Sequence, residues 1–183
     1  MKKMLKNQKG FSLVELLIVI AIMGVLAAVA FSMFAGVLGN SKRRADERTA
    51  DQIAKAISAY MVDTGDTELT VLKSGSGGSK DVEEVIVNLQ KELWIWKDDS
   101  SGDFDSAEDK ESADPDAKPH PDAKKYGPYL TPKDGKEANY EFYAPQWDKH
   151  IGYCIKYYPG LMKADVTPVE EGGTVEVKVE EGK

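Results

Sequence analysis

One long apolar segment near the start of the chain most constrains its fold. Phe11 to Gly39 holds 23 apolar side chains in 29 positions, and its one charged residue is Glu15. The 23 uncharged residues from Leu16 to Leu38 form a helix of roughly 35 Å at about 1.5 Å per residue, longer than a hydrocarbon core of about 30 Å. This length predicts a membrane-spanning helix and argues against a purely cytosolic soluble domain.

The charges around this segment bear on its orientation. Four lysines lie within residues 1–10 and favour a cytoplasmic N-terminus, whereas the basic residues 42–44 oppose that signal. The formal net charge of −7 becomes −11 without the first ten residues, because 20 basic and 31 acidic side chains then remain. An acidic chain disfavours direct binding to nucleic acid, which needs clustered lysine and arginine.

Glu15 needs an explanation beyond membrane anchoring. A carboxylate within an apolar run is energetically costly and usually marks a function or a specific partner. Glu15 can lie shallow, near the lipid headgroups, or it can meet a cation that reaches the same depth. A free amine at Phe11, made by cutting the chain after Gly10, is the candidate cation nearby.

Residues 9–15, with the sequence KGFSLVE, precede an uninterrupted apolar helix. This arrangement resembles the class III leader of type IV prepilins and pseudopilins. The resemblance implies that residues 1–10 are a leader peptide, which a membrane prepilin peptidase removes between Gly10 and Phe11 before N-methylating Phe11. It also implies that residues 11–39 stay on the mature protein as a transmembrane helix and later form the core of a filament.

The resemblance further implies the partners and the location of the chain. The partners are other copies of itself in a helical homopolymer, the prepilin peptidase, and the assembly platform with its ATPase. The location is the cytoplasmic membrane as a single-pass precursor with its N-terminus inside, followed by an extracellular filament on the cell surface. In that filament Glu15 would pair with the methylated Phe11 ammonium of an adjacent subunit, which satisfies both charges only in the correct register.

Residues 40–65 are predicted to continue the helix as an amphipathic extension. One face carries apolar or small residues at helical spacing, and Asp46 is assigned to the polar remainder. The predicted face consists of Ala45, Thr49, Ile53, Ala56, Ile57, Tyr60 and Met61. One helix from about Ser12 to Val62, stopped by glycine at Gly65, is favoured over two helices broken near residues 36–40.

The predicted fold class is α+β, a long N-terminal helix packed on a small antiparallel sheet, as in the pilin fold. Within the head, residues 66–183, a helix is expected from a cap at residues 81–84, with its apolar spacing running to Trp96, although residues 94–96 equally suit a strand. Residues 97–124 carry ten acids and four bases and are predicted to be a mobile loop. Three strands are predicted within residues 138–181, near residues 140–142, 151–157 and 175–179.

Two short segments resemble those of pseudopilins more loosely than the leader does. Tyr60, Asp63 and Gly65 match a Y-x-x-D-x-G pattern, and residues 127–130 read GPYL. Cys154 is the single cysteine and forms no internal disulfide, whereas many Gram-negative pilins close a loop with two. This difference agrees better with a Gram-positive or pseudopilin-like member.

The sequence offers no catalytic, cofactor or metal motif. Aligning Gly102 with the EF-hand glycine puts Lys97 at the first ligand position, which argues against calcium. His120 and His150 have no partner at metal-ligand spacing and are interpreted as surface residues. We therefore expect no enzyme but a structural filament subunit, a pilin or a pseudopilin, with a minor or tip pilin acting as an adhesin or DNA-capture module as the alternative. The pilus or secretion system, and major or minor rank, stay open.

Overall fold

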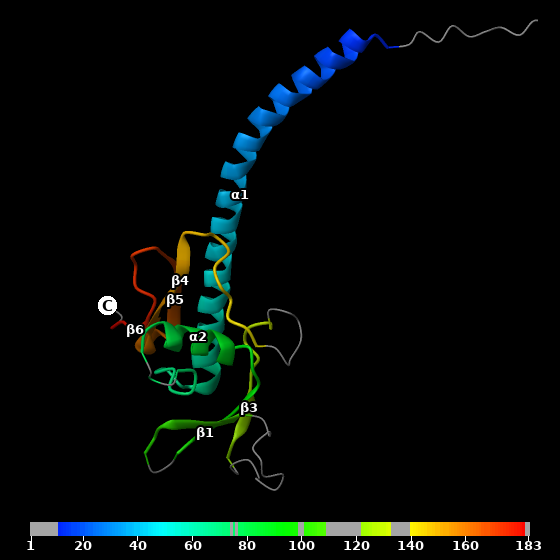
Figure 1. The fold of residues 1–183 in the computed structure, drawn as a ribbon. Coiled ribbons are helices and arrows are strands. Elements are labelled where there is room, and N and C mark those ends of the chain that lie inside the picture. Colours follow the sequence, from blue (N-terminus) through cyan, green and yellow to red (C-terminus); the bar gives the residue numbers. More distant parts are fainter. Residues whose placement is uncertain are drawn as a thin grey trace, which may run out of the picture. The chain divides into compact units, whose positions relative to one another are not determined.

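The computed structural model describes residues 11–73, 75, 77–98, 101–108, 122–132 and 140–181 (Figure 1). The chain separates into two compact units, residues 1–41 and residues 42–183. The helix α1 (Leu13–Thr64) contributes to both units without interruption, so the alternative of two helices broken near residues 36–40 is wrong. Unbroken apolar and then amphipathic periodicity, with no proline, explains this continuity.

The part of α1 in the first unit is strongly apolar. By length and composition α1 is able to cross a membrane, and among the described residues its most apolar stretch is not buried. Its large apolar side chains are therefore exposed along the first unit. A surface of this kind requires an apolar environment from outside the chain.

In the second unit, one face of α1 packs into the hydrophobic core. Its buried apolar side chains are Ala50, Ile53, Ala56, Ile57, Tyr60 and Met61. This set confirms most of the predicted face, with Ala45 and Thr49 half-buried. The helix ends as predicted, because Gly65 adopts a φ of +80° and its N–H donates to the Met61 carbonyl at 3.0 Å.

The helix α2 (Ser79–Asn88) packs Val82, Val85 and Ile86 into the same core. The predicted cap at residues 81–84 is wrong, since α2 begins at Ser79 after Gly78, which makes no side-chain cap hydrogen bond. The positive φ of Gly78 lets the chain enter the helix earlier than the capping pattern suggested. The helix also ends before the predicted apolar spacing does, so Trp96 lies in a strand.

The first sheet has the strand order β2-β1-β3, and both pairings are antiparallel. Its strands are β1 (Leu93–Lys97), β2 (Phe104–Glu108) and β3 (Lys124–Tyr126). Strand β2 lies within the predicted loop 97–124, so that part of the prediction is wrong. The ladder with β1 and the packing of Phe104 against the core outweigh the acidic local composition. Residues 109–121, which include His120, lie outside the described residues.

The second sheet has the order β5-β4-β6 and is mixed, not wholly antiparallel as predicted. It consists of β4 (His150–Tyr158), β5 (Lys163–Glu170) and β6 (Val177–Val179), with the 3₁₀ turn η1 (Pro159–Leu161) between β4 and β5. Strand β5 pairs antiparallel with β4, whereas β6 pairs parallel with β4. The α+β class is confirmed.

Strand β4 confirms the predicted strand at residues 151–157, and β6 confirms part of the third. Residues 140–142 form no strand, so the first of the three predictions is wrong. Phe142 instead packs edge-on against Tyr153 of β4, with the ring centroids 6.2 Å apart. Ile151 is exposed because the register with β5 shifts between His150 and Gly152.

Candidate functional site on the long helix

The start of α1 presents the carboxylate of Glu15 close in sequence to the exposed side chain of Phe11. Phe11 is 91% exposed, and Gly10 lies outside the described residues. Oε2 of Glu15 accepts a hydrogen bond from the Ser12 N–H at 3.0 Å, which is one half of a capping box. Within the residues that the structure describes, Glu15 forms no ion pair. The geometry therefore leaves carboxylate acceptor capacity for a cation from another molecule.

A second carboxylate on α1, that of Asp46, is almost completely buried at 1% exposure. Its Oδ1 accepts the Gln146 N–H at 2.7 Å, and its Oδ2 accepts the Trp147 N–H at 3.1 Å. Oδ2 also lies 2.7 Å from Nδ1 of His150, whose side chain is buried as well. Asp46 thereby fastens residues 146–150, about a hundred positions further along the chain, to the helix.

This Asp46 clamp, formed with Gln146, Trp147 and His150, corrects two predictions. Asp46 does not belong to the polar remainder of the helix, and His150 is not a surface residue. Asp46 precedes the buried Ala50 by four residues and Ile53 by seven, so helical spacing placed it on the buried face. This helical spacing was the sequence signal for burial of Asp46. No sequence pattern indicated that Gln146, Trp147 and His150 would be its partners.

Three basic side chains lie beside the segment that the clamp holds. The Arg43 guanidinium lies 5.7 Å from the centre of the Trp147 ring, and Lys149 Nζ lies 5.6 Å from the same ring. Trp147 also packs edge-on against His150, with centroids 4.7 Å apart. Lys42 pairs with Asp148 at 3.4 Å, an exposed ion pair that adds little stability.

The end of α1 is closed by a tyrosine–carboxylate network. The Tyr60 hydroxyl donates to buried Asp66 at 2.6 Å, and the Tyr129 hydroxyl donates to Asp63 at 2.7 Å. The two tyrosine rings meet edge to face at 5.7 Å. The Y-x-x-D-x-G residues thus hold the helix end against the GPYL segment, whose Tyr129 N–H also bonds the Leu89 carbonyl at 2.9 Å.

We predict that this network makes the head sensitive to alkali. Burial, followed by the negative charge of Asp66, raises the pKa of Tyr60 above its ordinary value of 10.0. Above about pH 10 the unfolded chain loses this proton and the folded chain keeps it, so the free energy of unfolding falls as the pH rises. The contribution of Tyr60 is up to about 1.4 kcal/mol per pH unit.

Urea unfolding of the wild type and of Tyr60→Phe between about pH 8 and pH 11 measures this contribution. Burial also raises the pKa of Tyr153, so the variant should flatten the alkaline decline without removing it. Equal slopes for the two proteins would contradict the prediction.

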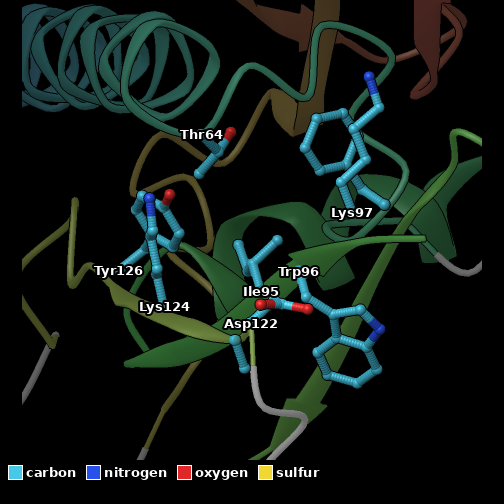
Figure 2. Close-up of a pocket in the computed structure, with 9 residues that line it drawn as sticks. Thr64, Ile95, Trp96, Lys97, Asp122, Lys124 and Tyr126 are labelled. Atoms are coloured by element: carbon cyan, nitrogen blue, oxygen red, sulfur yellow. The ribbon is translucent and has the colours of Figure 1, made fainter. Parts of the chain in front are cut away.

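A cavity of about 630 Å³ opens beside the first sheet (Figure 2). Its lining includes Thr64 at the end of α1, Lys97 of β1, and Lys124 and Tyr126 of β3, together with Asp122. Among the described residues, no group of three histidine, cysteine or carboxylate side chains is placed to hold a metal ion. None of the sequence-predicted site residues lines this cavity.

Comparison with known proteins finds a family and a relative that are similar to part of this chain. The family described as prokaryotic N-terminal methylation motif matches residues 5–31, which contain Gly10, Phe11 and Glu15. The chain is also 43% identical over 63 residues to the fimbrial protein EcpC of Eikenella corrodens. This alignment covers 34% of the chain and 41% of that protein. No solved structure matches the chain.

The two similarities and the fold agree with one another. The methylation motif, the fimbrial relative and the long helix packed with small sheets support a protein of the type IV pilin family. The resemblance of residues 9–15 to a prepilin leader is thereby confirmed at the level of the family.

Proposed function

We propose that this chain is a structural filament subunit, cleaved between Gly10 and Phe11, N-methylated at Phe11 and polymerised into a type IV pilus-like filament. The observation that carries the proposal is an apolar helix, within and beyond the methylation motif, whose most apolar stretch is not buried by any part of the chain that the structure describes. Lipid covers this surface before assembly, and other copies cover it afterwards.

Glu15 would supply the register of assembly. Cleavage creates an ammonium group at Phe11, which a methyl group leaves basic. The Glu15 oxygen Oε2 is occupied by the Ser12 N–H, but a carboxylate has about four acceptor positions, so the ammonium of an adjacent subunit can also bind. Because two desolvated charges are satisfied only when they meet, the pair selects one stagger between neighbouring helices.

The proposed life cycle needs three kinds of partner. A membrane prepilin peptidase would cut and methylate the precursor, and an assembly platform with its ATPase would move it from the cytoplasmic membrane into an extracellular filament. The remaining partner is the chain itself, as a helical homopolymer. The protein would then have a structural role and no catalytic one.

We predict that filament-associated protein begins at N-methylated Phe11. Mass spectrometry of the N-terminal peptide from sheared filaments measures this start directly. A Gly10→Val variant is the matched control, because a side chain before the scissile bond should block close approach of the peptidase and leave the precursor uncut. An intact Met1, or a start other than Phe11, would contradict the proposed cleavage.

The alternative function is that of a minor or tip pilin that binds a receptor or captures DNA. No specific contact among the described residues favours it, and a net charge of −11 after Gly10 opposes direct phosphate binding by the head as a whole. Quantitative proteomics of sheared filaments separates the two functions. A major subunit should dominate the filament protein, whereas a tip pilin should be rare.

A further inference from the structure

Positive charge in the second unit gathers in one place. Residues 42–48 and 145–150 carry five basic and three acidic side chains, whereas the rest of residues 42–183 carries 15 basic and 27 acidic ones. The two segments are joined by the Asp46 clamp and by the Lys42–Asp148 pair. We call residues 42–48 and 145–150 the basic patch.

The chain itself limits how far this patch lies from a membrane. Lys42 follows Leu38, the end of the uncharged apolar run, by four residues, which span at most about 14 Å even when fully extended. The headgroup region extends roughly 5–7 Å beyond the hydrocarbon core. Long basic side chains also reach toward it. When the apolar run spans a bilayer, the start of the patch therefore lies at or near the headgroups.

The composition of the patch suits that depth. Trp147 is half-buried beside Arg43 and Lys149, and tryptophan is enriched at membrane interfaces because its ring is apolar and its N–H is polar. Arg44 and Arg48 are exposed, and no hydrogen bond or ion pair joins their side chains to other described residues. Arginine binds phosphate through two parallel N–H donors.

We propose that the basic patch binds the phosphates of anionic lipid headgroups in the membrane that the apolar helix spans, and so holds the head against the bilayer before assembly. The inference rests on the proposed membrane-anchored precursor. Asp46 is the positioning residue, since it holds the segment with Trp147 and Lys149 beside residues 42–48. The basic residues 42–44 oppose the orientation signal of the N-terminal lysines. Binding of lipid phosphates would give them a role on the side of the membrane opposite to those lysines.

The test follows Trp147 in the full chain reconstituted into vesicles. Replacing Trp94 and Trp96 by phenylalanine leaves Trp147 as the remaining tryptophan of three. Lipids with a quencher on the headgroup then report its depth, in vesicles of phosphatidylcholine with or without phosphatidylglycerol. We expect stronger quenching with phosphatidylglycerol, and a loss of that increment in high salt.

Two variants assign the effect to the patch. Arg44→Gln combined with Arg48→Gln should reduce quenching to the level in pure phosphatidylcholine, and Asp46→Asn should reduce it in both lipids by releasing the segment. Lys55→Gln, which removes an exposed charge further along α1, is the matched control and should leave quenching unchanged.

The outcomes separate this inference from the proposed function. A chain that floats with the vesicles but shows equal quenching in both lipids overturns the inference alone. Quenching that changes with the protein-to-lipid ratio at constant lipid composition also overturns it, because a second copy then occupies the patch. A chain that fails to float with the vesicles contradicts the membrane-anchored precursor, and the inference falls with it.

Discussion

Replacing Glu15 by alanine is expected to abolish filament formation while leaving the chain inserted in the membrane. Insertion depends on the apolar run from Leu16 to Leu38, which the substitution does not touch. Assembly would lose the partner of the Phe11 ammonium, and that ammonium would then be desolvated without compensation. Removing one partner of a buried ion pair is strongly unfavourable, about 3–5 kcal/mol, and the penalty recurs at every subunit. Glu15→Lys should fail as well, because two positive charges would then meet.

A matched set of variants separates charge pairing from helix capping. Glu15→Gln keeps an oxygen that can accept the Ser12 N–H but removes the charge, so it should assemble as poorly as Glu15→Ala. Asp51→Ala removes an exposed carboxylate elsewhere on α1 and should assemble normally. Filament yield is measured in sheared fractions, and insertion by membrane flotation. Normal yield from Glu15→Ala would refute the charge pair, and normal yield from Glu15→Gln alone would assign Glu15 to capping.

Replacing Asp46 by alanine should cause the largest loss of stability in the head. The substitution leaves the Gln146 and Trp147 N–H groups and the His150 ring without their acceptor in a buried site. Each buried donor left without its acceptor costs about 1–3 kcal/mol, so the loss of this acceptor should lower the free energy of unfolding by several kcal/mol. A head of this size has only about 5–15 kcal/mol of net stability, so a large part would be lost.

Urea unfolding of the full chain in detergent, followed by tryptophan fluorescence, measures this loss. His150→Ala should cost less than Asp46→Ala, because Asp46 then keeps two backbone hydrogen bonds. Asp51→Ala is again the control and should change the free energy of unfolding by no more than about 0.5 kcal/mol. A loss below about 1 kcal/mol for Asp46→Ala would show that the clamp is not a main support of the head.

If the clamp is lost, the basic patch should also lose its shape. The segment that carries Trp147 is held to α1 by the three contacts of Asp46, whereas the Lys42–Asp148 pair is exposed and weak. Arg43 also lies 5.7 Å from the centre of the Trp147 ring. Stability of the head and contact with lipid would therefore change together in Asp46 variants. They would separate in the Arg44 and Arg48 variants, which leave the clamp intact.

Elements with a strong local period were predictable. The single helix through residues 13–64, its stop at Gly65 and the strand around Tyr153 and Ile155 follow from spacing, from glycine conformation and from alternation. Gly10, Phe11 and Glu15 belong to a short motif of fixed spacing, and the family match to residues 5–31 contains all three.

Predictions failed where distant partners overrode local composition. An acidic stretch forms β2 because β1 offers it a complete backbone ladder. Residues 140–142 alternate like a strand but form none. Strand β6 pairs parallel with β4. The alternation of apolar and polar residues does not predict this direction, because parallel and antiparallel strands show the same alternation.

The apolar span, the unbroken helix and the position of Glu15 within it are predictable from the residues alone, because each depends on length, period or local spacing. The buried pair of Asp46 and His150, which are 104 residues apart, follows instead from the folding of the whole head. Whether a carboxylate on a helix can be buried depends on the hydrogen-bond donors that reach it. Here the donors come from backbone N–H groups and a ring that the fold brings together, and no local pattern encodes them.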